Sequence, residues 1–390
     1  MDDLIFEREL AIRYVRLTFV LEMPEACIWP KSKVSALRGG MGEMLLRQNC
    51  VRDRNCDVCD FESECLVRRT IYSKYAIQPP FATGKDSIGY VLECHDFNTD
   101  FEAGQQLHFQ LMLFGKAIVY LNEFLQAFYA LGMNGIGVHE AHFAIAAVLN
   151  EDRQPIVSGH NVYMENYVIR KISDYVKKRM KKIQTFHEEN NNTFLVKVRT
   201  PASVKYHGEF IDKFQPEAIL QSIVRRVFML DCYEGIPSAE EPEASEIEGS
   251  ETQASQNQEP EIQESQTEET ETKASETKRF ITESSEAKKS EIQASKTMES
   301  ETQSSASDKI SFRFQHVPER MVPVLKSQTA IPTGVQRYSS TAGSKMTLHG
   351  IRGEMSVSGV GPECLELLLA AELTHIGKNT SFGFGEIILS

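Results

Sequence analysis

Twelve residues near the C-terminus, His375 to Glu386, combine a histidine, a lysine and three glycines in the stretch HIGKNTSFGFGE. A glycine-rich turn between a helix and a sheet lets backbone N–H groups approach a phosphate without side chains in the way. We therefore predict that Gly377, Gly383 and Gly385 present their backbone to a phosphate and that Lys378 adds positive charge. The pattern is not a P-loop, because the lysine precedes most of the glycines. The alternative is a tight connection that needs small residues.

Four of the eight cysteines lie within sixteen residues, spaced C-x5-C-x2-C-x5-C: Cys50, Cys56, Cys59 and Cys65. Four thiolates at such short spacing suit a tetrahedral zinc ion, and two disulfides are not expected in a reducing compartment. An iron–sulfur cluster is the alternative metal site, since four cysteines also hold such clusters. Unpaired surface thiols are the remaining interpretation. A closed four-cysteine site leaves no position for water, so the predicted zinc is structural and fixes an insertion without a core.

The negative charge of the chain is concentrated in one segment. Residues 237–308 carry 18 Glu and one Asp against five Lys and one Arg, which accounts for the whole net charge of −13. The segment has almost no aromatic residue and repeats loosely, so we expect a disordered acidic insertion. The rest of the chain is neutral overall, which leaves a nucleic-acid partner possible. Charged and polar residues interrupt the most apolar stretch, so we expect a cytoplasmic protein without a signal peptide or membrane span.

Apolar periodicity predicts the same element order, β-α-β-β-α-β, on both sides of the insertion. In the first half we expect a strand at 11–23, a helix at 31–48, strands at 88–94 and 107–114, a helix at 116–131 and a strand at 142–149. In the second half we expect a strand at 193–199, a helix that begins at Pro216, a hairpin within 345–359 that turns at 351–353, a helix at 362–373 and a final strand. The predicted fold is α+β, with tandem ferredoxin-like domains.

The predicted domain boundaries follow from these elements. Residues 1–155 form an N-terminal domain with the cysteine insertion at 50–65, and residues 156–192 form a basic connector. The C-terminal domain combines residues 193–236 and 309–390, separated in sequence by the acidic insertion 237–308.

Several sequence blocks resemble one known family. The blocks are LRGGMGEMLL with the four cysteines after it, LMLFGKAIVYL, FLVKVRTPASVK, VQRYSSTAGSKMTLHGIRGEM and HIGKNTSFGFGEI. Together they resemble the RAMP-superfamily endoribonucleases that process CRISPR precursor RNA. This resemblance implies two ferredoxin-like domains, metal-independent cleavage of repeat RNA, and a crRNA product that stays bound as the guide of an effector complex.

Such a cleavage requires little beyond a proton-transfer group and positive charge. A ribose 2′-oxygen attacks the adjacent phosphorus, so the protein must hold the backbone, move a proton and neutralise a developing dianion. We predict that His375 is catalytic, because it adjoins the glycine turn and falls in the family's terminal motif. Arg337 and Lys345, which flank the expected hairpin, are predicted phosphate partners in the same reaction. His349 and His139 are the next candidates.

Further RNA contacts are predicted along the basic connector, at Lys177, Lys178, Arg179 and Lys181. The alternative for this run is a solvated helix face. In many members of the family the catalytic histidine lies in or near the first helix, yet residues 31–48 contain none. A non-catalytic RAMP-fold subunit that binds crRNA is therefore a second hypothesis. A zinc-dependent interaction protein, whose glycine loop docks on a partner, is the third.

Overall fold

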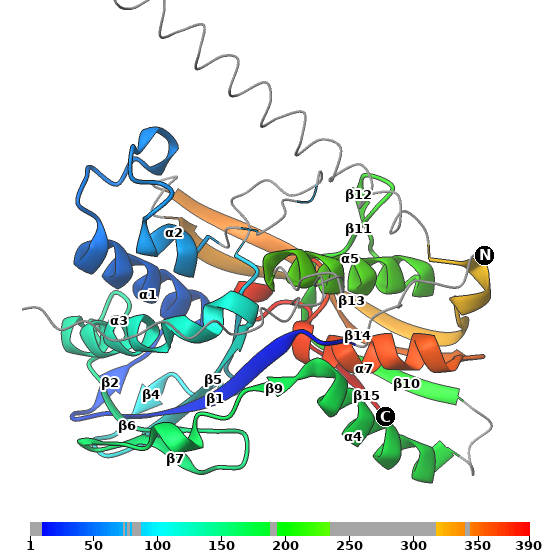
Figure 1. Cartoon of the computed structure of the whole chain (residues 1–390), viewed down its shortest axis with the longest axis horizontal. Coiled ribbons are helices and arrows are strands. Elements are labelled where there is room, and N and C mark those ends of the chain that lie inside the picture. The colour runs from blue at the N-terminus through cyan, green and yellow to red at the C-terminus, as the bar shows by residue number, and fades with distance from the viewer. Residues whose placement is uncertain are drawn as a thin grey trace, which may run out of the picture. The chain divides into compact units, whose positions relative to one another are not determined.

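The structure is a computed structural model, and it divides the chain into two units (Figure 1). One unit contains Met1–Ile236 and Ser307–Ser390, and the other contains Pro237–Ala306. The structure describes residues 10–72, 75, 79, 87–187, 193–234, 317–339 and 344–390. The predicted acidic insertion, 237–308, lies outside the described residues, so everything below concerns the first unit. No helix in the described part of the chain combines the length and apolar character needed to cross a membrane.

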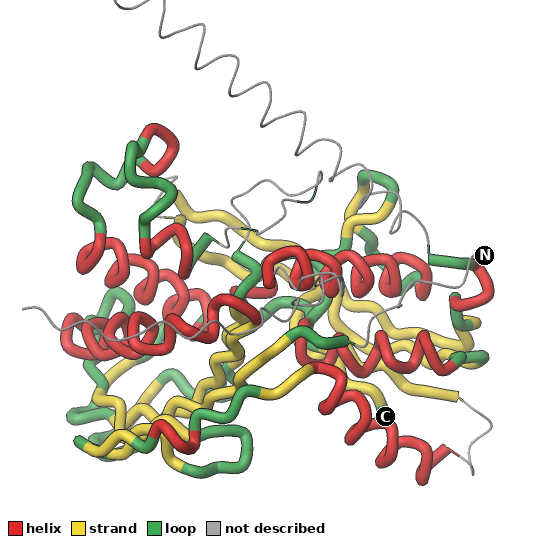
Figure 2. Tube along the Cα trace, in the orientation of Figure 1, coloured by secondary structure: helices red, strands yellow, loops and turns green. Residues whose placement is uncertain are grey.

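The N-terminal half builds one antiparallel sheet and two helices in the predicted order. Its strands run in the spatial order β3-β5-β1-β6 and continue into β7 and β8, while β9 pairs with the start of β1. Helices α1 and α3 pack against each other (Figure 2). The elements are β1 (Arg13–Glu22), α1 (Lys33–Asn49), β3 (Tyr90–Glu93), β5 (Gln106–Phe114), α3 (Leu121–Asn134), β6 (Ala144–Leu149), β7 (Pro155–Ser158), β8 (Asn161–Val162) and β9 (Arg170–Lys171).

The apolar patterns that predicted these elements coincide with the observed core. The alternating side chains of β1, from Val15 to Leu21, are at most 2% exposed on the predicted face. Leu37, Met41 and Leu45 recur at helical spacing on α1 and are fully buried. This burial explains why a sequence that alternates forms a strand here and why one with a longer period forms a helix.

The C-terminal half repeats the order β-α-β-β-α-β with a sheet of its own. Its strands lie in the spatial order β13-β14-β10-β15, all antiparallel, and α5 packs on α7. The elements are β10 (Thr193–Ala202), α5 (Pro216–Glu234), β13 (Val324–Ser339), β14 (Ser344–Ser358), α7 (Pro362–Thr374) and β15 (Ile387–Leu389).

The remaining elements are α4, which lies between the two halves in the sequence, and several short ones. Helix α4 packs against α7. The others form two small strand pairs, one short helix and five 3-10 turns. They are α4 (Ile172–His187), α2 (Leu66–Thr70), β2 (Cys27–Ile28) with β4 (Asp100–Phe101), β11 (Lys205–Tyr206) with β12 (Glu209–Phe210), η1 (Cys56–Val58), η2 (Gly115–Tyr120), η3 (Met164–Asn166), η4 (Glu319–Met321) and η5 (Thr380–Phe382).

The predicted hairpin turn at 351–353 is wrong. Residues 344–358 form a single strand, β14, which pairs along its whole length with β13. The two glycines that suggested a turn allow close backbone approach instead. A Cβ on Gly353 would lie 1.8 Å from the carbonyl oxygen of Thr329, and one on Gly350 would lie 2.9 Å from the backbone of Ala202. The long hairpin is therefore β13–β14, and its strands end at Ser339 and Ser344.

Candidate functional site

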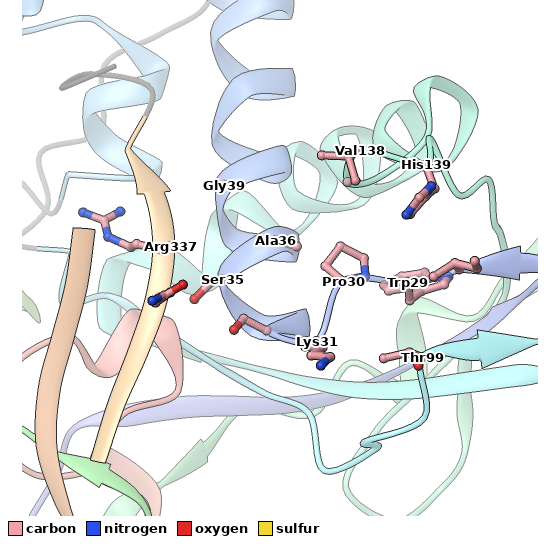
Figure 3. A pocket seen from close by; sticks show the side chains of 14 residues that line it. Trp29, Pro30, Lys31, Ser35, Ala36, Gly39, Thr99, Val138, His139 and Arg337 are labelled. Atoms are coloured by element: carbon pink, nitrogen blue, oxygen red, sulfur yellow. The ribbon is translucent and has the colours of Figure 1, made fainter. Parts of the chain in front are cut away.

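A cavity of about 520 Å³ is lined by residues of both halves (Figure 3). The N-terminal half contributes the segment before α1, the start of α1 itself, and the loop after α3. The C-terminal half contributes the edge strand β13. The lining residues with polar or titratable side chains include Lys31, Ser32, Ser35, His139 and Arg337. The cavity thus combines an imidazole, cations and hydroxyl groups.

The start of α1 brings positive charge to this cavity. Ser32 is the N-cap residue, but its side chain makes no capping hydrogen bond to the helix. The N–H groups of the first helical turn carry the positive end of the helix dipole. Lys31, one residue earlier, is exposed and adds a full charge. Together they form an electropositive wall that favours an anionic ligand.

The loop after α3 carries His139 to the opposite side of the cavity, as Figure 3 shows. Gly137 has a φ of +77°, and a Cβ there would lie 2.6 Å from the Cγ atom of Pro30. Glycine therefore allows this loop to lie directly against the segment that leads into α1. His139 itself is exposed. Its imidazole is accessible to a ligand, which catalysis of proton transfer requires.

His375, the histidine predicted to be catalytic, lies in the interior and is 0% exposed. Its Nδ1 atom is 2.8 Å from the carbonyl oxygen of Phe384, and its Nε2 atom is 2.7 Å from Oε1 of Glu93. Burial alone would raise the pKa of Glu93, but the hydrogen bond and charge of His375 outweigh burial and lower it. Both ring nitrogens are therefore occupied by partners within the protein. This position favours a structural role and does not support catalysis by His375.

The glycine loop does not offer the free backbone donors that the sequence predicted. Each of the four N–H groups has an acceptor within the protein, at 2.8 to 3.0 Å: Gly377 with Ser222 Oγ, Lys378 with Ser203 O, Gly383 with Thr380 O and Gly385 with Pro201 O. The glycines have positive φ and let the loop touch neighbouring backbone, because a Cβ on Gly385 would lie 1.9 Å from the oxygen of Ile376. The alternative interpretation, a tight connection that needs small residues, describes this loop. The Lys378 side chain is exposed.

The predicted phosphate partners lie at different places on the β13–β14 hairpin. Arg337 lines the cavity, and its guanidinium lies over the ring of Phe382, 4.6 Å from the centroid. Lys345 pairs across the hairpin with Tyr338, is exposed, and does not line the cavity. His349 is also exposed and faces Gly334 on the neighbouring strand. Only Arg337 among these three is placed at the cavity.

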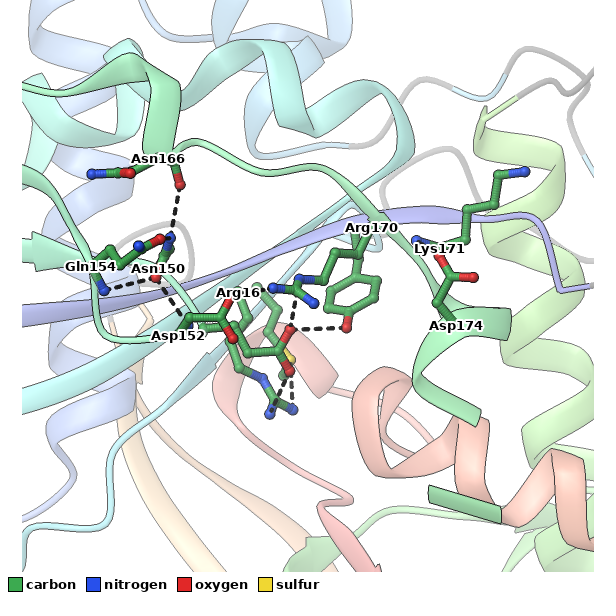
Figure 4. Close-up of polar contacts among 11 residues, drawn as sticks. Arg16, Asn150, Asp152, Gln154, Asn166, Arg170, Lys171 and Asp174 are labelled. Atoms are coloured by element: carbon green, nitrogen blue, oxygen red, sulfur yellow. Dashed lines mark hydrogen bonds and ion pairs between the residues drawn. The ribbon is translucent and has the colours of Figure 1, made fainter. Parts of the chain in front are cut away.

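The basic connector is partly engaged in ion pairs. Arg170 pairs with Glu151 and Asp152, with 3.3 Å to the Glu151 carboxylate (Figure 4). Arg179 forms a bidentate ion pair with Glu372 of α7, with 2.7 Å between each donor nitrogen and its carboxylate oxygen. This guanidinium therefore ties α4 to α7, which corrects its predicted role in RNA binding. Three predicted lysines occupy exposed positions on α4 and do not line the cavity: Lys177, Lys178 and Lys181.

The four cysteines of the predicted metal site are all half-buried. Burial raises the pKa of the Cys56 thiol, and the other three cysteine sulfurs raise it further, so the four lie within electrostatic range of one another. Among the described residues, three possible metal ligands have donor atoms that all lie within 4.8 Å of one another: Glu93, His95 and Glu386. The four cysteines do not form such a group in the described part of the chain. A zinc ion would have to draw the sulfurs closer together. Four thiol groups are suitable ligands for a zinc ion, and bound zinc stays a prediction.

Two family models match the sequence. Residues 196–387 match the model of the CRISPR-associated endoribonuclease Cas6 family, and residues 11–173 match a model described as the AF_1859 N-terminal domain. This chain is a Cas6-type protein. No curated protein matches the sequence.

Solved structures of Cas6 and RAMP proteins resemble the Cas6-type chain at low sequence identity. A chain of a partial Cas6-RT-Cas1–Cas2 complex is 8% identical, with a TM-score of 0.48, and the alignment covers 97% of this chain and 46% of that one. This chain therefore spans about half the length of that one. Thermus thermophilus Cas6 is 9% identical, with a TM-score of 0.40 and coverage of 97% and 99%. A structure described as a RAMP protein binding different RNA substrates is 8% identical, with a TM-score of 0.36 and coverage of 96% and 99%.

Sequence reasoning missed several residues at this site. Lys31 and Ser35 line the cavity, while Arg38 and Phe382 lie beside Arg337. One signal was present in the sequence, because the block WPKSK places a cation and a hydroxyl at the predicted helix start. Nothing local indicates that Phe382, far along the chain, meets Arg38.

Proposed function

We propose that this Cas6-type protein is an endoribonuclease that cleaves CRISPR repeat RNA at the cavity between α1, the loop after α3 and β13. The observation that carries the proposal is the composition of that cavity. An accessible imidazole, a lysine, two serine hydroxyls and a helix N-terminus line one pocket large enough for a nucleotide. We further propose that the two β-α-β-β-α-β halves are ferredoxin-like domains, which their strand orders support.

The reaction proceeds without a metal ion at the reacting centre. His139 accepts the proton of a ribose 2′-hydroxyl as the 2′-oxygen bonds to the adjacent phosphorus. The bond from phosphorus to the 5′-oxygen breaks, and that oxygen takes a proton from water, so one product ends in a 2′,3′-cyclic phosphate and the other in a 5′-hydroxyl. Lys31 and the start of α1 neutralise the charge that develops on the phosphoryl oxygens. His139 and the Lys31–α1 segment line the cavity from two different parts of the chain, which holds the RNA backbone in place during attack.

We also propose that the cleaved crRNA stays bound and serves as the guide of an effector complex, which makes subunits of that complex the expected protein partners. The family match supports this role. The exposed lysines of α4 extend the positive surface beyond the cavity and provide further backbone contacts.

The four cysteines are proposed to hold one structural zinc ion. A zinc ion supplies cross-links that a segment without a core lacks. Three apolar side chains of this segment remain exposed: Val51 at 79%, Val58 at 70% and Phe61 at 50%. Elemental analysis of the reduced protein is expected to find about one zinc per chain, and Cys56→Ser is expected to lose it. Reduced protein without zinc would reject this assignment, and bound iron would favour the cluster instead.

Cleavage of labelled repeat RNA by the full chain, under single-turnover conditions in chelator, tests the proposed activity. His139→Ala is expected to slow cleavage at least a hundredfold, equivalent to about 3 kcal/mol of barrier, while RNA affinity barely changes. His349→Ala is the matched control, because His349 is equally exposed but lies outside the cavity. Its cleavage rate is expected to equal that of the wild type.

The outcomes separate the three hypotheses. If wild-type protein shifts repeat RNA on a gel but never cleaves it, the chain is the non-catalytic crRNA-binding subunit. If it neither binds nor cleaves, the zinc-dependent interaction protein is favoured. Cleavage that persists in His139→Ala assigns the proton transfer to another group.

A further inference from the structure

Two arginines converge on one aromatic ring beside the cavity. Arg38 of α1 and Arg337 of β13 each place the guanidinium carbon 4.6 Å from the centroid of Phe382. Phe382 ends η5, in the glycine-rich loop, and its ring is partly exposed. The three residues come from segments that are far apart in the sequence, so only the fold brings them together.

The positive charge of this pair is not compensated by a nearby acid. Neither guanidinium forms an ion pair with any residue that the structure describes. Arg38 donates a hydrogen bond from its guanidinium to Oγ of Ser87, at 3.1 Å. The Nε atoms of both arginines are buried and lack a hydrogen-bonding partner. Two like charges with unsatisfied donors, held near each other, cost free energy in the free protein.

The effect of this crowding is visible at Arg337. Burial lowers the pKa of its guanidinium, and the charge of Arg38 lowers it further. Stacking on the faces of an aromatic ring keeps guanidinium planes oriented without neutralising them. The two planar guanidinium groups are therefore oriented to bind one anion that has several acceptor oxygens.

We propose that Arg38, Phe382 and Arg337 form a clamp that binds one phosphodiester group of the RNA backbone next to the cleavage cavity. This inference rests on the proposed function, because it takes repeat RNA as the ligand. Arg337 also lines the cavity, so the clamped phosphate lies close to the phosphorus that the 2′-oxygen attacks. The clamp fixes the RNA backbone and thereby its register in the cavity.

The glycine-rich loop has a defined task in this arrangement. Gly383 follows Phe382 with a φ of +73°, and a Cβ there would lie 2.7 Å from the oxygen of Leu92 and 3.3 Å from Val34. Glycine thus allows η5 to pack between β3 and α1, where Phe382 meets Arg38. The loop contributes to phosphate binding by positioning an aromatic ring, not through its own N–H groups.

Affinity of the full chain for repeat RNA, measured over a range of salt concentrations, tests the clamp. Arg38→Ala and Arg337→Ala are each expected to weaken binding about tenfold, and each lost phosphate contact is expected to flatten the plot of log affinity against log salt by about 0.7. Arg38→Lys keeps the charge but loses the planar fork, so its loss is expected to lie between wild type and Arg38→Ala. Arg47→Ala is the matched control on the same helix, since Arg47 already pairs with Glu43 at 2.9 Å.

A second measurement locates the phosphate. Single neutral methylphosphonates are placed in turn along the RNA. At one position the substitution is expected to weaken wild-type binding about tenfold and to leave the binding of the Arg38→Ala, Arg337→Ala double variant unchanged. No such position, or equal losses in both proteins at every position, would reject the clamp.

Unfolding of the free protein distinguishes a binding role from a structural one. Removal of either arginine relieves repulsion, so the midpoint of unfolding is expected to stay the same or rise. A fall in the midpoint together with unchanged RNA affinity would make the stack purely structural. If affinity falls as expected but no variant, wild type included, cleaves RNA, the clamp stands and the proposed activity fails. If cleavage depends on His139 while both alanine variants bind like wild type, the activity stands and the clamp fails.

Discussion

The two loops that follow the second helix of each half resemble each other in sequence and differ in what covers them. Both contain glycines with positive φ; the loop after α3 has two histidines, His139 and His142, and the loop after α7 has one, His375. His139, in the loop after α3, is exposed at the cavity, whereas His375, in the loop after α7, is completely buried against Glu93. The C-terminal loop is covered because η5 packs on β3 and α1 of the other half.

This comparison shows that a histidine beside a glycine turn does not by itself indicate catalysis. The same local pattern gives an accessible imidazole in one half and, in the other, a buried imidazole that is hydrogen-bonded to Glu93 of β3. The environment decides which, because an imidazole buried between two acceptors cannot exchange a proton with a substrate.

His375→Ala is expected to lower the free energy of unfolding by about 3–5 kcal/mol, because it leaves the buried carboxylate of Glu93 without its partner. His139→Ala, at an exposed position, is expected to change it by less than about 0.5 kcal/mol. Urea unfolding of both variants measures the difference. Equal stabilities for the two variants would contradict the contrast between the loops.

Gly385→Ala is expected to lower the free energy of unfolding by at least about 1–3 kcal/mol, the range for a strained backbone, since the new Cβ would also collide with the oxygen of Ile376. Gly359→Ala is the control, because Gly359 has a similar φ of +71° but nothing within 4 Å of the added atom. The difference between these two variants in thermal unfolding isolates the backbone contact. A loop held loosely would make the two losses equal.

Stability is expected to fall in acid because of Glu93. The pKa of Glu93 is lower in the folded protein than in the unfolded chain. Its ionised carboxylate therefore contributes to the free energy of unfolding above about pH 4.3, and this contribution is lost as the pH falls through the pKa of the folded state. Burial and the charge of Glu93 raise the pKa of Glu386, which has the opposite effect on stability. Comparison of Glu386→Gln with the Glu93→Gln, Glu386→Gln double variant removes the contribution of Glu386, and the protein that keeps Glu93 is expected to lose more stability between pH 5 and 3. Parallel curves would exclude an ionised Glu93 in the pair.

Deletion of residues 237–308 is expected to have the smallest effect. RNA affinity is expected to stay the same or to rise modestly, since the segment carries a net charge of −13 and repels the RNA. Gel-shift titration at low salt measures this. A deletion variant that unfolds or loses RNA binding would show that the segment contributes to the fold or to the site.

Most helices and strands of this protein could be predicted from its apolar periodicity. Alternation from Val15 to Leu21 and the helical stripe from Leu37 to Leu45 gave a strand and a helix, since each pattern records which side of its element is buried. The order β-α-β-β-α-β in both halves followed from the same periodicity. The hairpin was misplaced because glycines that permit close backbone contact look like glycines that permit turns.

Which of these residues a ligand can reach depends on contacts between segments that are distant in the sequence. His375 is bound by Glu93, 282 residues earlier in the chain, and the ring of Phe382 is contacted by arginines of both halves. The loop whose glycines suggested a phosphate cradle uses its N–H groups on Ser203, Ser222 and Pro201 instead. Local sequence cannot specify these partners, because burial and hydrogen bonding between distant segments depend on how the two sheets pack and not on the spacing of residues along the chain.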